Sequence, residues 1–242
     1  SESMPKPSGI FSPCRYRKNK MADGKNNIFM LGVVHRDAEG PNLLLQWLER
    51  IMPRIITLEF SHYGLTFRKK KGKEYKKRIR EVMTKIKENN WKYNAETLAD
   101  LLSYIDMPYE YEIASRYTKK HNGLLYLIDL DIFSHLKLIN SEELFQPANI
   151  EKLLCNGKNH CNVSEKAMAK LFFEGGVKVA RYTEEMHARD RYMRDKISIL
   201  MRAHKDKRFL HICGWQHLED PHNLYTPLNP EKVFIYDKTV RI

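Results

Sequence analysis

Short apolar runs rich in β-prone residues alternate along the chain with stretches in which apolar residues recur every three or four positions. The first pattern is typical of buried strands, and the second is typical of helices that pack against a sheet. Prolines mark both ends of one helical stretch, since Pro41 begins it and Pro53 ends it. The predicted strands are 28–31, 54–60, 124–128, 208–213 and 232–236.

Residues 28–60 have the order strand, helix, strand, and two strands joined in this way lie parallel. The whole order predicts an α/β fold in which a central sheet of parallel βαβ units is flanked by helices, with 232–236 as an edge strand. Residues 134–179 are helical and rich in loops, without clear bounds. The predicted helices are 41–52, 73–90, 95–105, 109–121 and 181–203.

The length of 242 residues suits one domain with one sizeable core. Residues 1–26 are polar and carry scattered prolines, so we expect a flexible basic N-terminal arm before a single domain over 27–242. No apolar run approaches the roughly 18 residues that span a bilayer. The four cysteines form no CxxC pair, which favours a reducing compartment. We therefore expect a soluble cytoplasmic protein, or the soluble part of a membrane-associated one.

The pattern Gly-x-x-His occurs twice, each time at the end of an apolar run. Its histidines are His35 and His217. Glu59 and Asp129 also end predicted strands, and Asp131 closely follows Asp129. Because ligand sites of α/β folds lie beyond the carboxyl ends of parallel strands, we expect these five side chains to gather at one edge of the sheet.

Imidazole and carboxylate ligands suit a divalent ion such as Zn, Mn, Co or Fe. Such an ion lowers the pKa of a bound water, which makes hydrolysis the natural reaction, with Glu59 as a ligand or as the general base. Arg189 lies on or beside the apolar stripe of the helix 181–203. It would stabilise an oxyanion, orient Glu59, or form a purely structural ion pair. The competing interpretation is that the histidines are ordinary hydrogen-bonded residues.

Several ordered motifs resemble the TraB family, which belongs to a superfamily that includes Tiki proteases, GumN-like proteins, erythromycin esterases and ChaN-like proteins. The resemblance covers roughly 28–60, 108–132 and 184–217. Its motifs are the two GxxH sequences, the acidic helix start at Glu110, the strand end at 129–131 and the segment 189–193. Two positions depart from the family pattern, since Leu130 replaces an arginine and Ala188 replaces a common glutamate.

The resemblance implies a compact α/β fold of two related halves, each ending a strand in GxxH. The Tiki branch is a metal-dependent peptidase that favours Mn or Co, the esterase branch is thought to need no metal, and the ChaN-like branch binds haem. The implied active-site core is His35, Glu59 and His217, with Glu110, Asp129 and Arg189 in support.

These observations predict a metal-dependent hydrolase, with a peptide as the first expected substrate and a small ester as the second. The expected ion is Mn, Co or Zn, and catalysis is assigned to Glu59, His35, His217 and Arg189. The alternatives are a metal-independent esterase-like enzyme and a non-catalytic protein that binds a peptide or haem. A homodimer is a further alternative. The expected metal ligands are His35, His217, Glu59, Glu110 and Asp129.

A different class of function is suggested by charge. The chain carries a net charge of +12, and many of its cations cluster between Arg68 and Arg80, with Phe67 and Tyr75 nearby. Runs of this kind usually form solvated helical faces, but they also bind nucleic acid or anionic membranes. The cluster therefore predicts an anionic partner as the competing interpretation.

Overall fold

The computed structural model describes residues 27–156, 164–175 and 182–237. The predicted N-terminal arm, 1–26, lies outside these residues. One sheet has the strand order β3-β2-β4-β1-β5, and every neighbouring pair is parallel. The predicted α/β fold with a parallel sheet is confirmed, and the last strand lies at an edge, as expected. The strands are β1 Ile28–Val33, β2 Ile55–Leu58, β3 Leu124–Leu127, β4 Phe209–Gly214 and β5 Glu231–Phe234.

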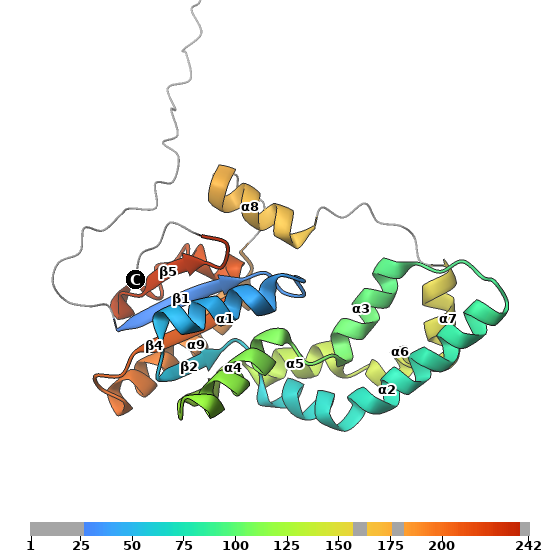
Figure 1. Cartoon of the computed structure of the whole chain (residues 1–242), viewed down its shortest axis with the longest axis horizontal. Helices are drawn as coiled ribbons and strands as arrows, with labels where there is room; N and C mark the ends of the chain where they lie inside the picture. The colour runs from blue at the N-terminus through green and yellow to red at the C-terminus, as the bar shows by residue number, and fades with distance from the viewer. Residues whose placement is uncertain (1–26, 157–163, 176–181, 238–242) are drawn as a thin grey trace, which may run out of the picture.

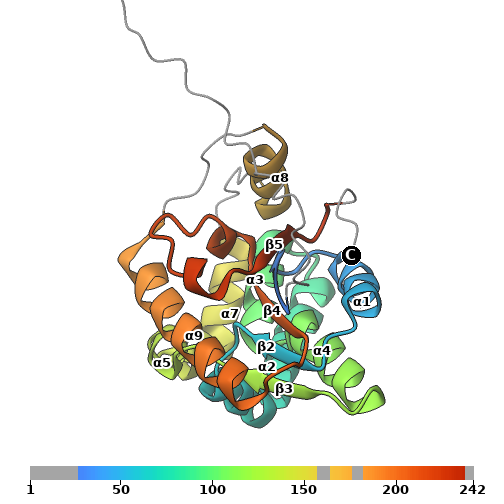
Figure 2. The ribbon, with the colours of Figure 1, turned by 90° about the vertical axis from the view of Figure 1, so that its left-hand side faces the viewer.

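Helices cover both faces of the sheet, and Figure 2 shows α9 on one side of the strands with α1 and α4 on the other. This sandwich explains why β1 and β4 are buried along their whole length and consist mostly of apolar residues. The helices are α1 Gly40–Ile51, α2 His62–Glu88, α3 Ala95–Ile105, α4 Tyr109–Lys120, α5 Asp131–Leu138, α6 Ser141–Leu144, α7 Pro147–Asn156, α8 Glu165–Gly175 and α9 Glu184–Ala203, with 3₁₀ turns η1 Trp215–Leu218 and η2 Thr226–Leu228.

The helix α1 shows how sequence pattern becomes packing. Leu44, Leu48 and Ile51 recur at helical spacing and are completely buried against the sheet. The helix ends where Met52 adopts a left-handed conformation with φ 49°, directly before Pro53. The predicted helix 41–52 thus differs from the observed one by a single residue at each end.

A group of helices, α2, α3, α6 and α7, extends to one side of the sheet, as Figure 1 shows. We call this group the helical extension. It has a hydrophobic core separate from the one around the sheet, so its helices are held together by contacts of their own. That second core consists of Tyr75, Ile79, Val82, Ile86, Leu101, Ile105, Phe145, Ile150 and Leu154.

The helix α2 begins at His62, although the sequence pattern predicts a start at residue 73. The side chain of Ser61 accepts a hydrogen bond from the backbone N–H of Gly64 at 2.9 Å, which caps the helix. The prediction was wrong because residues 62–72 carry few apolar positions, so periodicity gives little signal there. The poorly readable stretch 134–179 contains most of α5, and α6 to α8. Among the described residues, none of the helices is both long enough and apolar enough to cross a membrane.

Candidate active site

The carboxyl ends of four neighbouring strands bring the predicted site residues together. Glu59 and Asp129 follow β2 and β3, His35 follows β1, and His217 lies in the turn after β4. The four strands are adjacent in the order β3-β2-β4-β1. Parallel pairing therefore places all four side chains at the same edge of the sheet, as the sequence predicts.

The Glu59 carboxylate is the centre of this group, and its side chain is only 6% exposed. Its Oε1 accepts a hydrogen bond from Nη2 of Arg189 at 2.5 Å and lies 3.0 Å from Nε2 of His217. Its Oε2 accepts from the backbone N–H of Gly214 at 2.6 Å. Burial raises the pKa of Glu59, but the charges of His217 and Arg189 outweigh burial and hold that pKa well below its usual value.

His217 is buried between two carboxylates. Its Nδ1 lies 2.6 Å from Oδ1 of Asp190, opposite its contact with Glu59. Burial lowers the pKa of His217, but the charge of Glu59 and the hydrogen bond with Asp190 outweigh burial and raise the pKa to about 10. The imidazole is therefore a cation that joins the two acids at neutral pH.

Asp190 completes this arrangement, and the sequence analysis did not assign it to the site. It is fully buried and accepts hydrogen bonds from the hydroxyls of Tyr225, at 2.8 Å, and Tyr182. The sequence contains one indication that Asp190 is buried at the site, because it follows Arg189 on or beside the apolar stripe of α9. Tyr182 was placed inside the predicted helix 181–203 but lies just before α9, and Tyr225 comes from a loop with no periodic pattern, so neither tyrosine gave a signal.

Arg189 bridges two carboxylates. Its Nε donates to Oδ1 of Asp129 at 2.9 Å, and its Nη2 donates to Oδ2 of Asp129 at 2.8 Å as well as to Glu59. The remaining nitrogen, Nη1, lies 3.9 Å from Glu185. Since Nε and Nη2 are committed to fixed acids, these contacts favour the interpretation in which Arg189 orients Glu59 over the one in which it stabilises an oxyanion.

His35 differs from the other members because its side chain is 45% exposed. Its Nδ1 lies 2.7 Å from Oε1 of Glu110, which is almost completely buried at the start of α4. Burial lowers the pKa of His35, but the hydrogen bond and charge of Glu110 outweigh burial, and the charges of Glu59 and Glu165 add to them, so that the pKa is about 9. Among the described residues no hydrogen bond engages its Nε2.

The two GxxH motifs depend on each other through their glycines. A Cβ atom at Gly214 would lie 2.9 Å from Nε2 of His35, and a Cβ atom at Gly32 would lie 2.9 Å from the backbone Cα of Trp215 and 2.5 Å from Leu218. Gly214 of the second motif therefore leaves room for His35 of the first, and Gly32 of the first leaves room for Trp215 of the second. Glycine is needed at both positions because the ends of the neighbouring strands β1 and β4 approach closely.

His211 is a further buried histidine near the site that the sequence analysis did not single out. It lies on β4, and its Nδ1 is 3.1 Å from the hydroxyl of Thr57. Burial lowers the pKa of His211 to about 4, so the ring is neutral, unlike that of His217. Its role in the described structure is packing between β4 and Tyr225, whose ring stacks on it.

The metal ion predicted from the sequence would need at least three donor atoms that point at one position, each with a free lone pair. Both oxygens of Glu59 and both ring nitrogens of His217 already have protein partners, and the Arg189 cation lies between Glu59 and Asp129. Within the described ranges, no group of three or more His, Cys, Asp or Glu side chains is arranged to hold an ion. The donor set in this arrangement does not fit a divalent cation.

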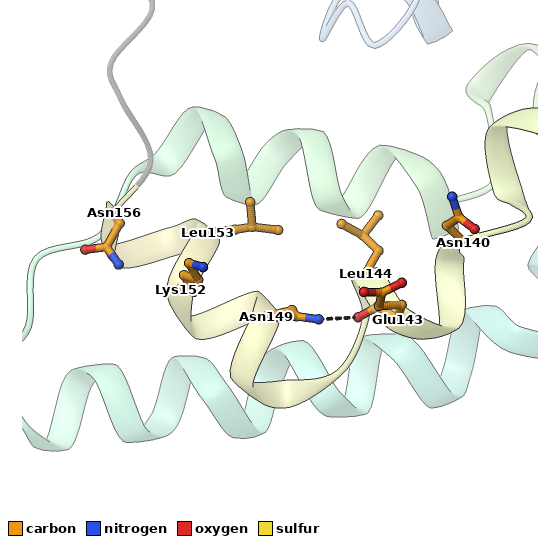
Figure 3. Close-up of a pocket in the computed structure, with 7 residues that line it drawn as sticks. All are labelled: Asn140, Glu143, Leu144, Asn149, Lys152, Leu153 and Asn156. Atoms are coloured by element: carbon orange, nitrogen blue, oxygen red, sulfur yellow. Dashed lines mark hydrogen bonds between the residues drawn. The ribbon is translucent and has the colours of Figure 1, made fainter.

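Two hollows of the described surface are lined by residues outside this group. Figure 3 shows one of about 500 Å³ on the helical extension, where the Asn149 side chain donates to the Glu143 carbonyl at 2.8 Å. Another, of about 830 Å³, lies between α1, α8 and β5. None of His35, Glu59, Asp129 and His217 lines either hollow.

Comparison of the chain with protein-family models, curated proteins and solved structures found no match. The resemblance to the TraB family therefore stays a prediction that depends on the motifs themselves. What the structure adds is the spatial convergence of those motifs at the carboxyl edge of one parallel sheet.

We expect Arg189→Met to destabilise the protein by about 3–5 kcal/mol, because it leaves the buried Asp129 without its cation and Glu59 with His217 alone. Urea unfolding would measure the change in the free energy of unfolding. Arg191→Met is a matched control, since Arg191 is an exposed arginine on the same helix. Equal stability of the two variants would contradict the proposed bridge.

Stability should also depend on pH through His217. Its pKa of about 10 in the folded protein exceeds the ordinary 6.5, so its contribution is complete below pH 6.5 and is lost as the pH rises through 10. His217 should therefore lower the free energy of unfolding of the wild type over this range by up to about 1.4 kcal/mol per pH unit, and His35 adds its own decline up to about pH 9. In His217→Gln this decline should be weaker, whereas His62→Gln, at an exposed position, should follow the wild-type curve. Parallel curves for all three proteins would show that His217 is not held as a cation.

Proposed function

We propose that this protein is a hydrolase that cleaves a peptide or ester bond without a metal ion, with His35 as the general base. The observation that supports this proposal is the pair formed by His35 and the buried Glu110, which leaves Nε2 of His35 without a protein partner at the carboxyl edge of the sheet. An imidazole backed by a carboxylate at one nitrogen and open at the other is the arrangement that general-base catalysis requires.

The chemistry follows from the tautomer that Glu110 favours. Its carboxylate accepts the Nδ1 proton of His35, so the neutral ring has its lone pair at Nε2. Nε2 takes a proton from a water molecule, whose oxygen attacks the carbonyl carbon of the substrate. The imidazolium then returns that proton to the departing amine or alkoxide as the bond breaks. Glu110 stabilises the imidazolium between the two steps.

Glu59 is the weaker candidate for the base. Its carboxylate accepts hydrogen bonds at both oxygens, and its pKa is held well below the usual value by His217 and Arg189. A carboxylate of low basicity with no vacant oxygen is poorly suited to deprotonate water. Its contacts support a different role, in which Glu59 fixes Gly214 and thereby the surface that faces His35.

The pH dependence of the reaction tests the assignment of the base. Only neutral His35 accepts a proton, and its pKa is about 9, so kcat/KM should rise about tenfold per pH unit from pH 6 and level off near pH 9. Glu110→Gln removes the carboxylate that raises this pKa and should move the midpoint to lower pH. Hydrolysis of p-nitrophenyl acetate and of a mixture of fluorogenic peptides would be measured across this range.

His35→Ala provides the matched loss of function, with an expected fall in kcat/KM of about 10²–10⁴-fold. Because the substitution also leaves the buried Glu110 without its partner, it should lower stability, and activity is compared on protein that circular dichroism shows to be folded. His121→Ala is the control, since His121 is an exposed residue after α4. A pH profile that Glu110→Gln does not move, or full activity of His35→Ala, would contradict His35 as the base.

Metal content separates this proposal from the metal-dependent hydrolase predicted from the sequence. We expect protein incubated with Mn²⁺, Co²⁺ or Zn²⁺ and then desalted to retain far less than one ion per chain, because Glu59 and His217 are already engaged. EDTA should leave the hydrolysis rate unchanged. Retention of about one ion per chain in the wild type, lost in His35→Ala, would instead support the metal-dependent enzyme.

A further inference from the structure

The helix α2 carries a large share of the positive charge of the chain. Its residues 62–88 include eleven Lys and Arg against three Glu, so the helix contributes +8 to a total of +12. The helix begins three residues after Glu59, and its later turns form one side of the helical extension and run away from the sheet (Figure 1). This concentration of charge is not used by the proposed hydrolysis.

About half of the cations predicted to form the cluster have internal partners. Arg78 pairs with Glu74 and Glu142, at 2.5 and 2.8 Å. Arg68 donates to the backbone carbonyls of Asp106 and Gly64. Lys71 and Lys76 also lie in ion pairs. These cations contact acids or carbonyls of the helical extension, so they are less available to a partner than cations without an ion pair.

The other cations form a row on the outer face of the helix. Lys69, Lys70, Lys73 and Arg80 are exposed, and within the described part of the chain they have no ion pair, while Lys77 lies 3.8 Å from Glu81. Lys73 follows Lys69 by four residues and Lys70 by three, and Arg80 follows Lys73 by two helical turns, so the four lie on one helical face. From Lys69 to Arg80 the row is about 16 Å long at 1.5 Å per residue. We call Lys69, Lys70, Lys73 and Arg80 the basic row.

The surroundings of the basic row favour a nucleic acid over a membrane. A helix that binds at a bilayer surface buries an apolar face among the lipids. The apolar face of α2 is already used, because Tyr75, Ile79 and Val82 are buried in the core of the helical extension. The exposed large hydrophobic side chains of the described residues include none from α2. The outer face of α2 therefore presents charged side chains without large apolar ones, and such a face complements a phosphodiester backbone.

We propose that the basic row binds the phosphodiester backbone of a nucleic acid without regard to sequence. Double-stranded DNA carries about one negative charge per 1.7 Å, so the row faces about ten charges over its length. Sequence readout is not expected, because the row consists of flexible cations on a face without aromatic side chains. The aromatic residues that the sequence places near it do not help, since Tyr75 stacks on Phe145 inside the extension.

The test is fluorescence anisotropy of the full chain with a labelled 20-base-pair DNA duplex and a duplex RNA of the same length. Four phosphate contacts predict a slope of about −3.6 in a plot of log affinity against log salt concentration, or a loss of about 10²-fold between 50 and 200 mM salt. The variant Lys69→Glu, Lys70→Glu, Lys73→Glu, Arg80→Glu should bind at least tenfold more weakly, with a flatter salt slope.

The matched control changes the same net charge elsewhere. Lys119, Lys120, Lys205 and Lys207 are exposed lysines outside the helical extension, and their replacement by Glu should leave most of the affinity in place. An equal loss in both variants would overturn the proposal, because net charge would then explain the binding. Binding to vesicles with 30% phosphatidylserine but not to either duplex would overturn it in favour of a membrane. Circular dichroism would verify that both variants are folded.

Discussion

The structure of the site depends on the neutralisation of one buried carboxylate. Glu59 leaves the end of β2 in a place that is almost closed to water, where an unpaired charge would be prohibitively unstable. Three donors from separate elements meet it: Arg189 from α9, His217 from η1 and the N–H of Gly214 from β4. The charge requirement therefore fixes how α9 and the second GxxH turn lie against the sheet.

His35 stands outside this closed network, and that difference divides the site into a rigid part and a reactive part. The buried carboxylates of Glu59, Asp129 and Asp190 are saturated with donors, so they hold geometry and have little capacity to exchange protons. His35 has one nitrogen fixed by Glu110 and one without a protein partner. Proton transfer needs a group that is both oriented and accessible, and His35 is the member that meets both conditions.

The sequence predicts those features that depend on local pattern. Apolar runs locate the five strands, and parallel pairing then brings His35, Glu59 and His217 to one edge. It does not identify the partners of each side chain, because a helical stripe indicates which face is buried but not what that face meets. Asp190 and its two tyrosines were missed for this reason. The same limit applies to the metal predicted from histidines and acids, since the sequence does not show that Arg189 lies between the carboxylates of Glu59 and Asp129.

The charged run of α2 illustrates the same point for surfaces. In the sequence, the cations between Arg68 and Arg80 are equivalent, but helical geometry divides them into residues that stabilise the helical extension and residues that face outward. The division is possible because the extension has its own hydrophobic core, so its outer face is not needed to hold the sheet. Changes to the outward cations should therefore alter association with polyanions while leaving the electrostatics at Glu59 and His35 intact. The two proposals concern separate surfaces, and the failure of one would leave the other standing.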